Sequence, residues 1–120
     1  MENKKVTRVL NVLPSMRAAG VESFVMNVYR NIDRSKIQFD FLVHTNKKEF
    51  FDDEIKKLGG RIYRLSLKDD KNFVKYIRDL NNFFKEHPEY TIVHGHMQSL
   101  MPLYLAVAKK NGVKERIAHS

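Results

Sequence analysis

The stretch RVLNVLPSMRAAGVE, residues 8–22, decides the fold of this 120-residue chain. Its apolar segment Val9–Leu13 is typical of a strand that is covered on both faces of a sheet. The loop Pro14–Gly20 follows, and a helix is expected to begin directly after it. In a parallel α/β sheet, the unpaired N–H groups and the positive end of that helix point into the opening at the carboxyl end of the strand. We therefore expect a ligand site at this opening.

Composition indicates one globular domain. Hydrophobic residues make up 42% of the chain and charged residues 30%, which excludes a disordered chain. The longest apolar run, Leu100–Ala108, is about half of the ~20 residues that a bilayer-spanning helix needs. The chain has no cysteine, which removes disulfides and thiol nucleophiles and suits a reducing cytoplasm.

The net charge of +8 comes from 22 Lys and Arg residues against 14 Asp and Glu residues. Such an excess favours nucleic acid, anionic lipid or phosphorylated ligands. The positive charges are dispersed along the chain rather than gathered in a dense run, so we expect a solvated lysine-rich surface and no nucleic-acid partner.

Strand and helix patterns alternate to the end of the chain. Strands are expected at 7–13, 37–44, 61–67, 91–94 and 116–120, and helices at 21–32, 50–58, 72–87 and 99–110. Right-handed crossovers then give a Rossmann-like three-layer αβα domain, with a mostly parallel sheet of about five strands and helices on both faces. Because a fifth strand without a following helix leaves the sheet partly uncovered, we expect residues 1–120 to be one domain of a longer protein.

Two helices carry specific packing predictions. In the first, an apolar stripe at three- and four-residue steps is expected to face the core; it comprises Val21, Phe24, Val25, Val28 and Ile32. The helix at 99–110 is apolar nearly all round, so we expect it to be deeply packed, with Ser99 as its N-cap.

Four of the five histidines follow or end predicted strands at the same edge of the sheet: His44, His94, His96 and His119. Ligands of open α/β sheets bind outside this edge. We expect His94 to be buried and bonded to backbone, and His44 to be structural or solvent-exposed. His96 lies one step further out and is the candidate to contact a hydroxyl or phosphate of a ligand.

The loop after the first strand offers Ser15, Arg17 and Gly20 to the same edge. Gly20 fits either close approach of a phosphate or a tight strand-to-helix turn, and Arg17 fits either an anion partner or a solvated side chain. The loop lacks the G-x-G-x-x-G spacing of a dinucleotide site, and no Walker lysine pattern is present.

A metal site is not expected. The rings of His94 and His96 are predicted to diverge, and no carboxylate nearby in sequence completes a ligand set. The adjacent pair Asp69 and Asp70 is interpreted as a capping turn rather than as catalytic carboxylates.

Three motifs resemble one enzyme family. Residues 8–33 resemble an opening strand, a "GGxE" loop and a first helix; TIVHGHMQS, residues 91–99, resembles a "(D)vvHxH" strand; ERIAHS, residues 115–120, resembles a strand ending "iaHsH". Together they are similar to the N-terminal half of retaining GT-B glycosyltransferases of family GT4, the "group 1" type of bacterial capsular and exopolysaccharide clusters. Ala19 departs from the family pattern, which usually has its first glycine there.

The resemblance implies two Rossmann-like domains across a cleft, with the acceptor bound mainly by this one. The nucleotide-sugar donor, a co-substrate rather than a cofactor, is bound mainly by a C-terminal domain with an E-x7-E motif, which is not found here. By resemblance, the Gly20 backbone approaches the donor diphosphate, His96 contacts the acceptor or the transferred sugar, and His119 ends the fifth strand. The family needs no metal.

The resemblance also implies that this chain alone is inactive. The basic charge suits a lipid-linked diphosphate sugar at the cytoplasmic face of a membrane.

The alternative class is a non-enzymatic flavodoxin-like domain, or a basic module that binds nucleic acid or another anion. A receiver-type domain should carry an aspartate at the end of a central strand, where this chain has histidines.

Overall fold

The computed structural model describes residues 6–14, 20–65, 73–97 and 100–118. Along these ranges five strands alternate with four helices, as predicted, and the observed boundaries lie within three residues of the expected ones. In chain order the elements are β1 (Thr7–Leu13), α1 (Gly20–Asn31), β2 (Ile37–Val43), α2 (Asp52–Lys57), β3 (Ile62–Arg64), α3 (Phe73–Glu86), β4 (Ile92–Gly95), α4 (Met101–Lys110) and β5 (Glu115–Ala118).

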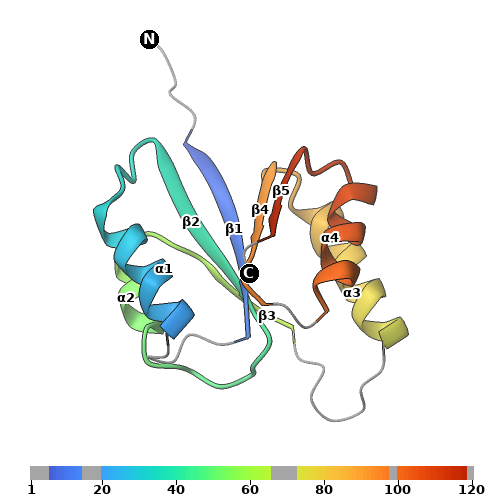
Figure 1. Cartoon of the computed structure of the whole chain (residues 1–120), viewed down its shortest axis with the longest axis horizontal. Coiled ribbons are helices and arrows are strands. Elements are labelled where there is room, and N and C mark those ends of the chain that lie inside the picture. Colours follow the sequence, from blue (N-terminus) through green and yellow to red (C-terminus); the bar gives the residue numbers. More distant parts are fainter. Residues whose placement is uncertain (1–5, 15–19, 66–72, 98–99, 119–120) are drawn as a thin grey trace.

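The strands form one sheet in the order β3-β2-β1-β4-β5, and every neighbouring pair is parallel. The chain moves outward from β1 to β3, and then from β4 to β5 in the opposite direction. Right-handed crossovers therefore place α1 and α2 on one face of the sheet and α3 and α4 on the other (Figure 1). The predicted Rossmann-like α/β class is confirmed.

Alternate strand residues build a separate core on each face. Below α3 and α4, the core includes Leu10 and Val12 of β1 and Val93 of β4. Below α1 and α2, it includes Leu13 of β1 and Phe41 of β2. Residues of β1 are thus buried on both sides, as its continuous apolar sequence predicts.

The buried face of α1 matches the predicted one only in part: Val25 is buried as expected. Tyr29 and Met26 are fully buried, whereas Phe24 is 54% exposed, Val21 42% and Val28 37%. The buried side of the helix packs against Leu13 of β1, Phe41 of β2 and the core that it shares with α2. No described helix packs over β4 and β5 on this face of the sheet (Figure 1).

The prediction for α4 is also wrong in detail. The helix begins at Met101, and Leu100 occupies the N-cap position in a left-handed conformation with φ 64°. Ser99, the expected cap, lies outside the described residues. Only one side of α4 is buried, through Tyr104, Val107 and Ala108. Packing on β4 requires one face of the helix and leaves the rest half-buried or exposed. None of the helices in the described ranges is long and apolar enough to cross a membrane.

Asp40 of β2 holds several elements together on the α3/α4 face. Its fully buried carboxylate accepts hydrogen bonds from Arg8 Nε at 2.7 Å and Arg8 Nη2 at 2.9 Å. The Tyr90 hydroxyl donates to it at 2.5 Å and the Arg61 backbone N–H at 2.9 Å. Burial raises the pKa of Tyr90 above its usual range, so its hydroxyl stays protonated and remains a donor.

Candidate functional site

The candidate site lies at the carboxyl ends of β1 and β4. These two strands are neighbours at the middle of the sheet, where the direction of strand addition reverses. Crevices at such a switch point are the preferred ligand sites of open α/β sheets. The backbone N–H of His96 donates to the Val12 carbonyl oxygen at 3.0 Å, which holds the segment after β4 against the end of β1.

His96 is held from below by Asn11. The His96 Nε2 lies 3.1 Å from the Asn11 Oδ1, and Asn11 Nδ2 donates to the Asp40 carbonyl oxygen at 3.3 Å. Because the amide NH2 is directed to a carbonyl, its oxygen is left to accept from the imidazole. This assigns a proton to His96 Nε2, which donates to the Asn11 amide oxygen. Asn11 is fully buried and His96 is 8% exposed, so the pair is shielded from solvent.

The prediction that the His94 and His96 rings diverge is wrong. Their ring centroids lie 4.0 Å apart, with the planes tilted by 36°. Residues two apart in an extended strand point to the same face, and the extended path of β4 continues far enough to bring the rings together. Among the residues that the structure describes, no three His, Cys, Asp or Glu side chains gather as a metal site. That the protein uses no metal remains a prediction.

A small cavity of about 60 Å³ opens beside the two rings. It is lined by Asn11, Phe24, Val25, Val28, Phe39, His94 and His96. The volume holds one or two water molecules, not a sugar ring. The described residues therefore form one wall of a site, with polar side chains from the sheet and apolar ones from α1.

Gly20 begins α1 next to this wall. Its backbone is not in the left-handed region, and no heavy atom of the described residues lies within 4 Å of the position that a Cβ would take. Among the described residues, neither a left-handed turn nor close packing accounts for this glycine. Glu22, in the first turn of α1, is only 5% exposed, and its charge favours the positive end of the helix dipole.

Several predicted residues fall outside the described part of the chain. These are the candidates Ser15, Arg17 and His119, together with the Asp69 and Asp70 turn. Their proposed roles stay predictions. Of the predicted site residues, the structure thus describes His96 and Gly20, which follow β4 and β1 at the carboxyl edge of the sheet.

His44 has the structural role that was one of its two predicted alternatives. Its Nδ1 lies 3.1 Å from the Leu13 carbonyl oxygen and its Nε2 lies 2.7 Å from the Tyr76 hydroxyl. Burial lowers the pKa of His44 below its usual range, so the neutral form is favoured in the folded protein. Both ring nitrogens have partners within the fold, and the side chain ties the ends of β1 and β2 to α3.

Gly95 sets the close approach of α4 to the site. A Cβ at this position would lie 2.6 Å from the Tyr104 hydroxyl oxygen. That hydroxyl donates to the Met97 carbonyl oxygen, just after His96. The glycine between the two histidines therefore has a packing reason, because only a residue without a side chain lets Tyr104 reach the backbone after β4.

Sequence reasoning missed Asn11 as a site residue. One signal was available: it is the single polar residue in Val9–Leu13, a segment expected to be buried on both faces. A buried amide needs hydrogen-bond partners, and its position near the end of a central strand points to the carboxyl edge. Phe24 was also missed, because it was assigned to the buried stripe of α1.

Comparison with known proteins gives one informative match. The chain is 37% identical over 118 residues to "Putative glycosyltransferase EpsF" of Bacillus subtilis (strain 168). The aligned region covers 98% of this chain but 31% of the relative, so the chain spans about a third of that protein's length. No family model and no solved structure matches the chain. The resemblance to glycosyltransferases inferred from the sequence motifs is confirmed by this match.

Proposed function

We propose that this chain is the acceptor-binding part of a retaining glycosyltransferase. The full-length protein transfers a sugar from a nucleotide-sugar donor to a growing polysaccharide or a lipid-linked saccharide. The observation that carries the proposal is the buried Asn11–His96 pair at the switch point of the sheet. The likeness to a protein named as a glycosyltransferase supports the reaction class.

His96 contacts the acceptor or the transferred sugar in this proposal. The Nε2 proton is directed to Asn11, which orients the ring for contact with a sugar hydroxyl. Burial of Asn11 fixes the ring in one orientation before substrate arrives. A hydroxyl held in this way reaches the reacting carbon without a further loss of orientational freedom, which lowers the barrier to transfer.

Gly20 and the start of α1 serve the donor. No described residue fills the space next to Gly20, so a diphosphate can approach the backbone closely. The N–H groups of the first turn and the positive end of the dipole favour the negative charge that builds up on the leaving diphosphate. Arg17 and Ser15, in the preceding loop, add donors to the same anion, and His119 joins the rim at the end of β5.

The remaining parts of the reaction are assigned to the longer protein. A further domain of the same polypeptide holds most of the nucleotide sugar, and residues 1–120 alone are inactive. The transfer uses no metal or other cofactor. The protein works in the cytoplasm, with peripheral contact to the inner face of the membrane, where its basic charge meets lipid-linked diphosphate acceptors. Capsular polysaccharide or exopolysaccharide is the proposed product.

The test is a transfer assay on the full-length protein with a panel of radiolabelled nucleotide sugars and a lipid extract from the source cells. Wild type is expected to transfer one sugar with retention of the anomeric configuration, read by NMR of the product. His96→Gln should lower the rate by about 100-fold, whereas Asn31→Ala, on the exposed end of α1, should leave it unchanged. Absence of donor-dependent transfer, or a His96→Gln protein with the wild-type rate, would refute the proposal.

A further inference from the structure

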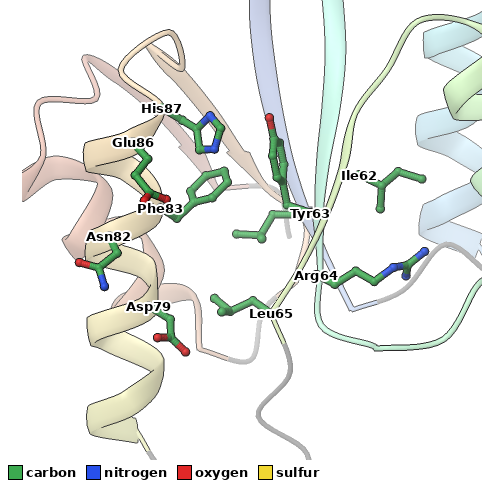
Figure 2. A pocket seen from close by; sticks show the side chains of 10 residues that line it. Ile62, Tyr63, Arg64, Leu65, Asp79, Asn82, Phe83, Glu86 and His87 are labelled. Atoms are coloured by element: carbon green, nitrogen blue, oxygen red, sulfur yellow. The ribbon is translucent and has the colours of Figure 1, made fainter.

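A second concave surface lies on the opposite face of the sheet from His96. It is a groove of about 430 Å³ between β3 and α3 (Figure 2). This volume is within the range of pockets that hold small organic ligands. Because β3 is the outermost strand on its side and α3 packs toward β4, the two elements leave the groove open to solvent.

One wall of the groove is aromatic and fixed in place. The Tyr63 ring centroid lies 4.8 Å from that of Phe83 and 4.9 Å from that of His87. In Figure 2, Phe83 and His87 extend from α3 toward Tyr63 on β3. The Tyr63 hydroxyl is hydrogen-bonded to that of Tyr90 at 2.9 Å, and Tyr90 in turn donates to the buried Asp40. The rings are therefore ordered by the fold and not by a ligand.

The other wall is a row of polar side chains on α3. Asp79, Asn82 and Glu86 line the groove at helical spacing, so they follow its length for about two turns, roughly 10 Å. Carboxylates accept hydrogen bonds, and the amide both donates and accepts. Such planar groups form hydrogen bonds with neighbouring hydroxyls on one ligand.

The charge of the groove excludes anions in spite of the +8 net charge of the chain. Glu86 and Asp79 are both acidic; Asp79 pairs with Lys75 at 3.0 Å, but Lys75 does not line the groove. Within the described residues, the only Lys or Arg that lines the groove is Arg64, and it is paired elsewhere. Its guanidinium pairs with Asp52 and donates to the Lys47 carbonyl oxygen at 2.8 Å. A phosphate, a nucleic acid or an anionic lipid would meet repulsion here.

We propose that the groove between β3 and α3 is a binding site for a neutral oligosaccharide. The apolar faces of sugar rings pack on Tyr63 and Phe83, while their hydroxyls donate to Glu86 and Asp79 and exchange hydrogen bonds with Asn82. That the natural ligand is part of the polymer being extended rests on the proposed function. The groove then acts as a second point of attachment, which raises the effective concentration of the acceptor near His96.

The test uses the full-length protein and saturation-transfer NMR with cellotriose, maltotriose and chitotriose, with glycerol and inorganic phosphate as negative controls. At least one trisaccharide should receive saturation, and the two controls should not. Glu86→Gln and Phe83→Leu, each verified as folded by circular dichroism, should weaken that trisaccharide by about tenfold. Lys85→Ala is the matched control, because Lys85 is exposed on the same helix and does not line the groove.

The two proposals fail in different ways. If no trisaccharide binds, or if both groove variants bind it as tightly as wild type, the groove proposal is refuted while transfer by the protein still supports the proposed function. If the trisaccharide binds His96→Gln as it binds wild type and weakens only in the groove variants, the groove is a separate site. Its binding then stands even where no donor-dependent transfer is found.

Discussion

Replacing Asn11 by alanine tests whether this residue sets the state of His96. The substitution removes the Oδ1 that lies 3.1 Å from His96 Nε2 and the Nδ2 that donates to the Asp40 carbonyl oxygen. Both atoms are buried, and an alanine offers neither donor nor acceptor. The His96 Nε2 then loses its contact with Asn11, so β1 no longer fixes the tautomer and the orientation of the imidazole.

The expected loss of stability follows from the two hydrogen bonds. A buried polar group without its partner costs about 1–3 kcal/mol. The Asp40 carbonyl lies within the β1–β2 ladder, so most of the lost stability comes from the unpaired His96 Nε2. We therefore expect about 2 kcal/mol in total. With an m-value of about 1.5 kcal/mol/M for a domain of this size, the urea midpoint should fall by roughly 1.3 M.

Two measurements on the 120-residue chain check this reasoning. Urea unfolding gives the midpoint, and long-range ¹H–¹⁵N NMR correlations of the imidazole report which nitrogen carries the proton. In wild type His96 should be protonated at Nε2, and in Asn11→Ala the Nε2 form should lose its dominance. Asn31→Ala, an exposed asparagine on α1, should change the midpoint by less than about 0.3 M. An unchanged His96 tautomer together with a midpoint shift no larger than that control would refute the assignment.

Other predictions concern stability and the donor. The pKa of His44 is lower in the folded protein, so the unfolded protein binds a proton at this residue more readily. The contribution of His44 to the free energy of unfolding is therefore full above the usual histidine pKa of about 6.5 and is lost as the pH falls through the pKa of the folded protein. Urea unfolding at pH 7.5 and 5.0 should show a smaller loss for His44→Gln than for wild type, and an equal loss would contradict the assignment. Gly95→Ala places a methyl group 2.6 Å from a tyrosine hydroxyl and should cost about 1–3 kcal/mol by thermal or urea unfolding. In Gly20→Ala, no described residue lies within 4 Å of the added methyl group, so the free energy of unfolding should stay within about 0.5 kcal/mol of wild type. Donor binding to the full-length protein should weaken, and an unaltered donor affinity would count against the diphosphate role. Asp40→Asn removes the charge that pairs with Arg8 and should lower the free energy of unfolding by roughly 3 kcal/mol. A decrease of less than about 1 kcal/mol in urea unfolding would contradict this expectation.

The order of elements was predictable because each strand and helix carries its own period and its own stop. Gly59 and Gly112 adopt positive φ of 95° and 86° after helices that the sequence expects to end there. The face of α1 was not predictable in the same way. Its sequence has apolar residues on more than one side, so periodicity alone did not decide between Phe24 and Tyr29. The choice depends on what lies below the helix, and that is a property of the sheet order.

The structure places His96 at the carboxyl edge, where the sequence predicts it, because parallel strands have all their carboxyl ends together. What the sequence did not reveal is which side chains meet there. The contact between Asn11 and His96 joins residues 85 positions apart, and it exists only because β4 returns to pair with β1. The close approach of the His94 and His96 rings was not predicted, because the two side chains were expected to diverge, whereas residues two apart in a strand share a face.

Asp40 links the two sites through the sheet. On the α1/α2 face its carbonyl oxygen accepts from Asn11, which holds His96. On the α3/α4 face its carboxylate accepts from Tyr90, whose hydroxyl bonds Tyr63 in the wall of the groove. Because the backbone and the side chain of one buried residue serve opposite faces, a shift of β2 at Asp40 would displace both His96 and the aromatic wall. The geometry of the His96 site and that of the groove between β3 and α3 are therefore set together by the centre of the sheet.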